Sequence, residues 1–498
     1  MRIDVVADIG FFESEPRILE IGQGQFYLIG VLPILTRVIL IINRPFSKFN
    51  FSMIQRLRVK LLGLSLFFSG IASTASAQSE IKWLGRNLID FTLDSVHEGL
   101  NEFKGLKRYI GDSRIVLLGE QSHGDGTTFE TKVKLVKYLH QEMGFSILAF
   151  ESNQYNAERA WEYVMQNKSP MLALQRSIHP IWSEAREIQP LFNYLLRESA
   201  GKNPLILSGF DCQALGWFLR NEFKNDLIEY LKEKKINFPD SVEQYTFFRL
   251  FDEIVYNKGY QDIKRKVWAE KVAYWDSLKG QVPEFKKLLE AKAGQLSAIN
   301  EPKAMLFSRF LLTTKNYLPQ ILYENLVDKT IPAGIRRNLR DSLMAENVMW
   351  LANEYYPGKK IIVWAANYHL AKHKTIGYGD LKETLMGDYI RRELDKETYT
   401  IAFTAYEGNI GWYNGRYLST LSAPKEGSVE SLFFQTGKEN FFLDFKTNSK
   451  SKKGKWLLNP MFMRPLGYVE QKKSWPLVFD AVIFNRTMRK VNGIVKKE

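Results

Sequence analysis

The sequence predicts an α/β protein in which helices cover a largely parallel central sheet and a helical insertion lies over the cleft. Three observations support this fold class: short apolar runs, helical patterns between most of the runs, and one long segment without strand signals. A parallel sheet follows because strands that alternate with helices form βαβ units. The apolar runs have the length and composition of buried strands and lie at Ile115–Leu118, Ser146–Phe150, Leu205–Ser208, Lys360–Trp364, Thr400–Thr404 and Phe479–Phe484.

One helix is indicated together with its C-terminal end. Apolar residues recur at intervals of three and four between Thr127 and Met143, which predicts an amphipathic helix, and Gly144 follows as a C-terminal cap. From about residue 215 to residue 350, charged amphipathic stretches replace the strand signals, so we predict a helical insertion there. Residues 440–475 are polar and contain proline and glycine, which favours a loop.

Composition restricts the class of protein. The chain has 498 residues, of which 45% are hydrophobic, and this is enough for a large core in one or two domains. The single cysteine, Cys212, excludes an intramolecular disulfide framework and a thiolate zinc cluster. The formal charge is +14, but the lysines and arginines are spread among acids, so we expect no nucleic-acid partner.

The N-terminal part carries a targeting pattern. After Met53 the chain has basic residues, then an apolar stretch, then Ala75-Ser76-Ala77, which is typical of a secretory signal peptide cleaved after Ala77. We therefore expect residues 53–77 to be a signal peptide and residues 78–498 to be the mature catalytic domain.

Residues 1–52 precede this pattern, and we interpret them as a wrongly extended reading frame. The expected location is periplasmic or secreted, with the protein either soluble or loosely associated with a membrane. A membrane span at Phe26–Ile42 is the competing interpretation, although Pro33 and Arg37 lie inside it.

Polar side chains follow the ends of the first four apolar runs. Because the carboxyl ends of parallel strands meet at one edge of a sheet, we expect these side chains to converge at the opening of one cleft there. In chain order they are Glu120 and His123, Glu151, Asp211, and then Asn367 and His369.

Glu120 and His123 are the strongest candidates for chemistry. A histidine can take a proton from water near neutral pH, and a neighbouring carboxylate can orient its ring. The structural alternative is that Glu120 satisfies loop amides and His123 caps the next helix. Glu151 ends an apolar run, where desolvation of a carboxylate indicates either a function or an ion pair with a residue such as Arg159.

Several familiar catalytic motifs are absent from the sequence. It has no G-x-S-x-G, H-E-x-x-H, Walker or dinucleotide-binding motif, so a conventional serine esterase is disfavoured and we expect no cofactor. A metal held by His123, His369 and carboxylates remains an alternative on ligand types, and it would make the protein a metal-dependent hydrolase.

The segment LLGEQSHGDGTTFETKVKLVKYLHQEMGFSILAFES resembles the opening of the erythromycin esterase family, in which G-E-x-x-H-G and a helix connect two strands and the second strand ends in A-F-E. Later segments are similar to further family motifs in the family's order, and together they span roughly residues 110–485. These segments are WSEAREIQPLFNYLLRES, LSGFDCQ, RDSLMAENVMWL, VWAANYH and FDAVIFNRT.

The resemblance implies metal-independent hydrolysis of a small-molecule ester, in the best-known members the lactone of erythromycin. It implies His123 as general base for water, with Glu120 and Glu151 as acidic residues that orient the base or the water. His369 would stabilise the developing oxyanion or position the substrate. Asn367, Tyr368 and Asp211 are the residues expected to contact the substrate.

Ala366 departs from the family pattern, because W-A-H-N-x-H has a histidine at that position. Alanine neither donates a hydrogen bond nor relays a proton. Three outcomes stay open: slower macrolide hydrolysis, a different substrate, or a catalytically inert protein that binds a hydrophobic ligand.

Overall fold

The computed structural model describes residues 78–93, 100–258, 264, 266–327, 330, 332–372 and 384–495. For residues 333–335 and 337, and for four strands before residue 43, it describes the backbone alone. The chain divides into two compact units, Met1–Trp83 and Leu84–Glu498. The signal peptide expected at 53–77 lies outside the described residues.

The first unit contains an antiparallel sheet with the strand order β1-β4-β3-β2. Two of its strands lie inside Phe26–Ile42, so the helical membrane span considered there is wrong. No helix among the described residues combines the length and the apolar character that crossing a membrane needs. The strands are β1 (Val5–Asp8), β2 (Arg17–Glu20), β3 (Phe26–Val31) and β4 (Arg37–Ile42).

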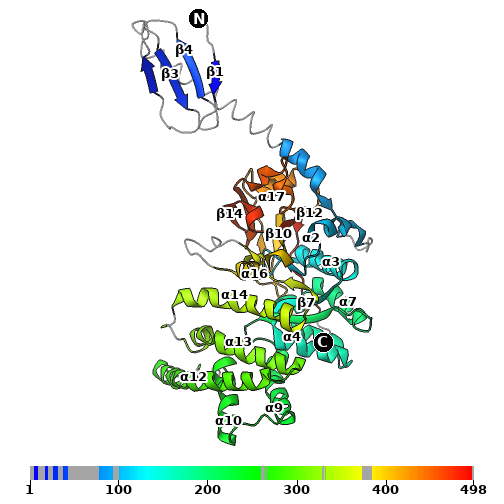
Figure 1. Ribbon diagram of the computed structural model, residues 1–498, viewed down its shortest axis with the longest axis vertical. Helices are drawn as coiled ribbons and strands as arrows, with labels where there is room; N and C mark the ends of the chain where they lie inside the picture. Colours follow the sequence, from blue (N-terminus) through cyan, green and yellow to red (C-terminus); the bar gives the residue numbers. More distant parts are fainter. Residues whose placement is uncertain are drawn as a thin grey trace. The chain divides into compact units, whose positions relative to one another are not determined.

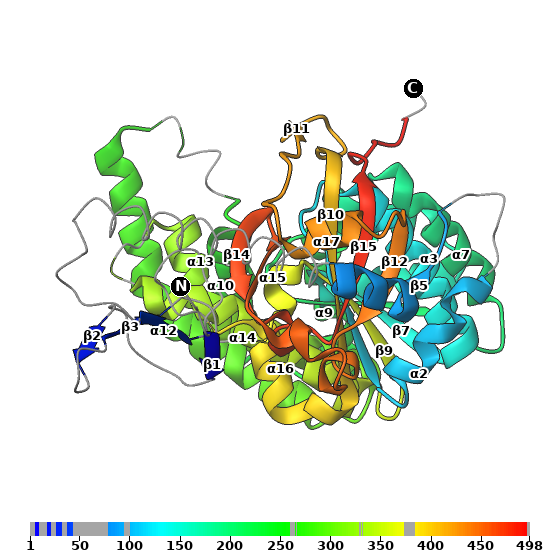
Figure 2. The same ribbon diagram turned by 90° about the horizontal axis from the view of Figure 1, so that it is seen from above.

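A nine-stranded sheet forms the centre of the second unit, with the order β5-β12-β15-β10-β6-β9-β7-β8 and β11 (Ser419–Thr420) paired to β10. Figure 2 shows β12, β15 and β10 side by side. The neighbours from β15 to β8 run parallel, and they are the six strands predicted from apolar runs. The predicted parallel sheet is therefore confirmed. Its strands are β6 (Ile115–Leu118), β7 (Phe145–Asn153), β8 (Ile206–Asp211), β9 (Lys360–Trp364), β10 (Thr398–Ile410) and β15 (Ala481–Met488).

Helices cover both faces of this sheet. Successive side chains of a strand point to opposite faces, so Val116 and Leu118 pack into one core while Ile115 and Leu117 pack into another. The first core includes α3 (Gly126–Met143) and α7 (Gln189–Ser199), and the second includes α14 (Ala333–Trp350) and α16 (Met386–Leu394). The helix predicted at Thr127–Met143 is α3, and Gly144 ends it with a φ of 72°.

A run of helices connects β8 to β9, as predicted for about residues 215–350. Figure 1 shows α12, α13 and α14 stacked in succession, and an aromatic core that includes Phe223, Phe251 and Phe310 holds this part together. Its last helix, α14, also packs on the sheet through Met344 and Val348. The other elements are α8 (Trp217–Asn221), α9 (Phe223–Glu233), α10 (Ser241–Leu250), the π-helix η4 (Phe251–Val255), α12 (Trp268–Ser297) and α13 (Pro302–Asn325).

Residues 440–475 do not form the predicted loop. β12 (Asn440–Asp444) pairs antiparallel with β15 and with β5 (Ile89–Asp90), and its apolar run was too short to stand out among the lysines that follow. β13 (Met461–Leu466) and β14 (Val469–Lys473) form a hairpin. The Gly467 amide at its turn donates a hydrogen bond to the Gln121 carbonyl at 3.0 Å, so the hairpin supports the loop that carries Glu120 and His123.

Short helices complete the second unit. They lie at α2 (Lys107–Ile110), α4 (Gln154–Met165), α5 (Pro170–Ser177), α6 (Pro180–Ser183), α15 (Asn367–Leu370) and α17 (Val429–Phe434).

Candidate active site

The carboxyl ends of β6, β9, β7 and β8 lie along one edge of the sheet, because these parallel strands are neighbours in that order. Glu120, Ala366, Glu151 and Asp211 lie at these four ends in the same lateral order. The chain passes from β6 to β7 while β9 lies between them, and such a switch point opens a crevice at the sheet edge. The structure therefore brings these predicted residues together.

The first group of side chains is the Glu120 cluster, made of Glu120, His123, Lys132, Trp182 and Trp364. The Glu120 carboxylate is fully buried and accepts four hydrogen bonds. Burial by itself would raise its pKa, but the charge of Lys132 and the hydrogen bond from His123 outweigh burial and lower the pKa. The four donors are His123 Nδ1 at 2.8 Å, Trp182 Nε1 at 3.0 Å, Lys132 Nζ at 2.8 Å and Trp364 Nε1 at 2.9 Å.

Lys132 supplies the buried positive charge of this cluster. It lies on α3 with its side chain fully buried, and its Nζ lies 4.0 Å from the centre of the Trp364 ring. Burial lowers the pKa of Lys132 to about 8 even though Glu120 acts in the opposite direction. The lysine and both tryptophans hold the Glu120 carboxylate in one position, so the carboxylate can in turn fix the His123 ring.

His123 turns its second nitrogen away from this buried network. The Glu120 carboxylate accepts from Nδ1, and Nε2 has no hydrogen-bond partner within the part of the chain that the structure describes. The side chain is 29% exposed, and its ring packs edge-on against Trp182 with the ring centres 5.3 Å apart. Nε2 is thus available to accept a proton from a small molecule that reaches the exposed side of the ring.

The second group is the Arg340 cluster, made of Glu151, Asp211, Arg340, Asp341 and His369. The Arg340 fork donates from Nη2 to Glu151 at 2.8 Å, and from Nη2 and Nε to the two Asp211 oxygens at 2.9 and 3.2 Å. The other Glu151 oxygen accepts from the Ala366 amide at 3.1 Å. Burial would raise the pKa of Glu151, but the charges of His369 and Arg340 hold this pKa well below its usual value.

The ion pair suggested between Glu151 and Arg159 is wrong. Arg159 instead pairs with Glu162 at 2.6 Å and Glu222 at 3.0 Å. The partner of Glu151 comes from α14, which is far along the chain.

His369 lies between two carboxylates. Its Nδ1 is 2.7 Å from Asp341 Oδ1 and its Nε2 is 3.4 Å from Glu151 Oε1. Burial would lower the pKa of His369, but these two carboxylates raise it to about 10. His369 is therefore an imidazolium at neutral pH. Arg340 Nη1 lies 3.3 Å from its Nε2, but the two groups are both cations and both nitrogens carry protons, so this contact is not a hydrogen bond.

This charge state predicts a pH dependence of stability. The folded pKa of His369 lies above its usual value of 6.5, so its stabilisation is complete below pH 6.5 and is lost as the pH rises through about 10. We expect His369→Gln to be several kcal/mol less stable than the native protein at pH 6, with the difference shrinking towards pH 10. Urea unfolding between pH 6 and pH 10 measures this difference, and a constant difference would contradict the prediction.

Three residues were expected to contact the substrate, and their surroundings in the structure differ. Asn367 is fully buried, and its amide pairs with the Phe403 carbonyl and amide and with the Pro465 carbonyl at 2.7–3.1 Å. All of its side-chain atoms that can form hydrogen bonds thus bind backbone groups. Tyr368 packs edge-on against His369, and Asp211 faces a cleft while it binds Arg340.

Sequence reasoning missed five members of these clusters: Lys132, Trp182, Trp364, Arg340 and Asp341. Every one of them lies inside a segment that carries the family resemblance, and Arg340-Asp341 opens RDSLMAENVMWL. That was the available signal. Spacing gave no further indication because α3, α6, β9 and α14 bring these residues together only in the folded chain.

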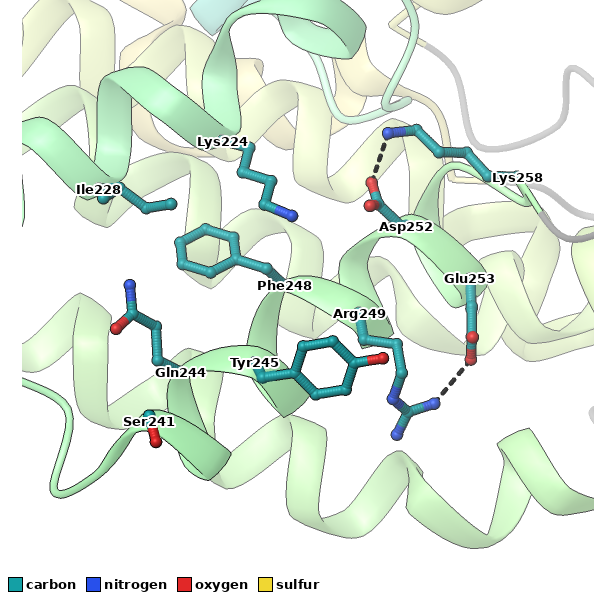
Figure 3. Close-up of a pocket in the computed structure, with 10 residues that line it drawn as sticks. All are labelled: Lys224, Ile228, Ser241, Gln244, Tyr245, Phe248, Arg249, Asp252, Glu253 and Lys258. Carbon is teal, nitrogen blue, oxygen red and sulfur yellow. Dashed lines mark hydrogen bonds and ion pairs between the residues drawn. The ribbon is translucent and has the colours of Figure 1, made fainter.

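The described surface of the second unit has several cavities, and the one at β10, β11 and the end of β15, of about 740 Å³, has no member of either cluster in its lining. Two others bear on the position of the site. One has a volume of about 530 Å³ and is lined in part by Glu151 and Asp211. The other, of about 510 Å³, lies on α9, α10 and η4, and its Arg249–Glu253 and Lys258–Asp252 pairs neutralise one another (Figure 3). No member of the Glu120 or Arg340 cluster lines the second cavity, so we place the candidate active site at the sheet edge.

Metal ligands are not grouped in the described residues. No set of three or more histidine, cysteine, aspartate or glutamate side chains there has the geometry to hold a metal ion. The carboxylates nearest to His369, Glu151 and Asp341, both contact its ring, and Glu151 also binds Arg340.

The family model for erythromycin esterase matches residues 140–488. The chain belongs to the erythromycin esterase family. The resemblance inferred from the motifs is therefore confirmed. The match includes the whole Arg340 cluster, but it begins after Glu120, His123 and Lys132.

Two relatives of this erythromycin esterase family member are named as a hydrolase and an esterase, which supports the conclusion that this protein is a hydrolase. The Bacillus subtilis (strain 168) protein "Putative hydrolase YbfO" is 31% identical over 461 residues, which cover 87% of this chain and 97% of that protein. Erythromycin esterase type II of Escherichia coli is 23% identical over 390 residues, which cover 73% of this chain and 88% of that protein. The solved structure of a mutant of the erythromycin esterase EreC, in its open conformation, shares the fold, with a TM-score of 0.59, 20% identity and coverage of 82% and 99% of the two chains.

Proposed function

We propose that the protein hydrolyses a carboxylic ester or lactone of a small molecule, with His123 as general base for water. The observation that carries this proposal is the bond between His123 Nδ1 and the fully buried Glu120 carboxylate, which leaves Nε2 of a partly exposed ring without a hydrogen-bond partner among the described residues. A buried carboxylate at Nδ1 fixes the tautomer that accepts a proton at Nε2 and stabilises the imidazolium that forms. General bases placed in this way contribute about 10²–10⁴-fold to rate.

The proposed reaction has two steps. His123 Nε2 takes a proton from water as the water oxygen bonds to the ester carbonyl carbon, and the carbonyl electron pair moves onto its oxygen. Collapse of this intermediate breaks the bond to the leaving alkoxide, which takes the proton from His123. The products are one carboxylic acid and one alcohol, and neither a metal nor a cofactor enters the proposal.

The Arg340 cluster supplies charge beside this base. His369 and Arg340 are both cationic, and they flank Glu151 at 3.4 and 2.8 Å. We assign His369 to stabilise the negative charge that develops on the carbonyl oxygen, and Glu151 to orient the attacking water.

The test is hydrolysis by the full chain next to His123→Ala. We would incubate both with a 14-membered macrolide and a panel of simple and bulky esters, with and without a chelator, and follow the products by mass spectrometry. We expect the native protein to add one water to at least one substrate regardless of the chelator, and the variant to be far slower. No turnover of any ester would contradict the proposal, and loss of activity with the chelator would favour a metal-dependent hydrolase.

Ala366 provides a second test, because an inert binding protein is the competing function. Its side chain is partly exposed, and its amide donates to Glu151, so a histidine there would lie beside the Arg340 cluster. We expect Ala366→His to raise kcat roughly tenfold or more, since it adds a group that can relay a proton. Ala366→Asn is the matched control, because it adds polar atoms without proton transfer, and equal rates in both variants would favour the binding protein.

We also propose that the protein is exported to the periplasm or the medium. The support is the pattern of basic residues, apolar stretch and Ala75-Ser76-Ala77 in residues 53–77. N-terminal sequencing of protein from cell fractions tests this. We expect a mature chain that begins at residue 78, and an uncleaved chain in the cytoplasm would contradict export.

A further inference from the structure

The cleft of about 530 Å³ beside Glu151 is formed by the ends of β7 and β8 together with α4, α5, α6 and α8. Its lining includes three carboxylates, and each of them already has a partner. Glu151 and Asp211 bind Arg340, and Glu184 is also engaged. Glu151 and Asp211 are therefore not free to neutralise other cations that face the cleft.

Two arginines of the same lining lack such a partner. Within the part of the chain that the structure describes, neither Arg176 nor Arg220 forms an ion pair, although both line the cleft. The Arg176 guanidinium lies over the ring of Trp217, 4.0 Å from its centre, and Trp217 is 37% exposed. This stacking uses the face of the guanidinium and leaves the N–H groups at its edge available.

The backbone segments that carry these arginines are joined to each other by Asn156. Asn156 donates to the carbonyls of Arg176 at 2.8 Å and Ser177 at 2.6 Å, and its side-chain oxygen accepts from the amides of Phe218 at 2.8 Å and Leu219 at 3.3 Å. One buried side chain therefore joins the end of α5 to the start of α8.

Gly216 permits this approach between the two helices. Its φ is 135°, and a Cβ there would lie 2.3 Å from the Asn156 amide, so only glycine fits. The cleft thus carries both arginines on joined backbone segments, and stacking on Trp217 orders the Arg176 guanidinium before any ligand binds, which reduces the cost of ordering that side chain on binding.

We propose that this cleft binds an anionic group of the substrate, a carboxylate or a phosphate, through Arg176 and Arg220. The proposal rests on the proposed ester hydrolysis, and it adds that the ester taken by this site carries an acidic substituent. A guanidinium fork binds carboxylate or phosphate oxygens with two parallel charge-assisted hydrogen bonds, which uncharged esters cannot accept as strongly. Because Glu151 lines the same cleft, an anion held there places the rest of the substrate next to the candidate catalytic residues.

The kinetic test compares charged and neutral esters of similar size on the full chain. Aryl monoesters of succinate and glutarate are matched with aryl butyrate and valerate, and an aryl ester that bears a phosphate replaces the carboxylate in a third arm. We expect kcat/KM to be at least about tenfold higher for the charged esters, mainly through KM, and the better charged arm identifies the anion. Arg176→Met keeps an apolar contact with Trp217 and should reduce the charged-to-neutral ratio roughly tenfold.

Arg249→Met is the control, because Arg249 lies in the remote cavity of Figure 3 and should leave the ratio unchanged. Equal kcat/KM for charged and neutral esters, or an unchanged ratio in Arg176→Met, would overturn the inference while ester hydrolysis stands.

If no ester is hydrolysed, calorimetric titration of the native chain and Arg176→Met with succinate monoamide and inorganic phosphate decides the inference separately. Binding that Arg176→Met weakens supports the anion site, and absence of binding of either anion overturns it.

Discussion

Arg340→Met is expected to lower the free energy of unfolding by about 3–5 kcal/mol and to remove turnover. Arg340 is the cation that donates to both Glu151 and Asp211, and both carboxylates are about 5% exposed. Methionine keeps most of the side-chain volume but removes the guanidinium that pairs with these carboxylates. A buried charge without a partner lowers the free energy of unfolding. Urea unfolding at pH 7 and the rate of ester hydrolysis measure the two effects.

The pH dependence of the Arg340→Met effect separates lost charge from lost packing. The folded pKa of Glu151 lies well below its usual value of 4.5, so the stabilisation is present above about pH 4.5 and is lost as the pH falls. The difference between variant and native protein should therefore shrink in acid. Arg249→Met is a matched control, since its side chain is 26% exposed against 25% for Arg340, and its ion pair with Glu253 should contribute less than about 1 kcal/mol. Equal losses in the two variants would contradict the assigned role of the Arg340 cluster.

His123→Ala is expected to lower kcat/KM by about 10²–10⁴-fold while the protein stays folded. The ring is 29% exposed, and its removal leaves Glu120 with three of its four donors, so we expect a change in unfolding free energy of about 1 kcal/mol. Steady-state hydrolysis of the best ester in the panel, next to urea unfolding, gives both numbers.

Added imidazole distinguishes a general base from a structural residue in His123→Ala. Removal of the ring leaves space beside Trp182, which packs edge-on against it. Imidazole in solution should enter this space and restore part of the rate, with a dependence on the neutral form of imidazole. A variant that retains native turnover, or one whose loss comes entirely from unfolding, would refute the assignment of the base.

Most of the fold could be predicted because its signals are local. Each of the six parallel strands contains a short apolar run that is buried, and α3 has an apolar stripe followed by a capping glycine. β12 and the β13–β14 hairpin escaped prediction because strands of five or six residues next to lysines give weak patterns. The first strand of the sheet, β5, has two residues and becomes a strand only through its pairing with β12.

Part of the candidate site could be predicted from the sequence. Glu120, Glu151, Asp211 and His369 were predicted at the carboxyl edge because each follows an apolar run, and they lie there. Asn367 follows the same rule, yet it binds backbone groups of residues 36 and 98 positions away. The side chain of a polar residue after a strand can either face the crevice or bind backbone groups of other segments. The position of the residue in the sequence does not distinguish these two cases.

By itself, the sequence determined the parallel sheet, the helices between its strands and the edge at which carboxylates and histidines gather, because periodicity and strand ends are properties of neighbouring residues. Only the tertiary structure decided which charges those groups meet. Trp364 lies 244 residues from Glu120, and Arg340 lies 189 residues from Glu151. Such pairings depend on strand order and helix packing, which act over distances along the chain that no local pattern records, and they set the protonation of Glu151 and His369.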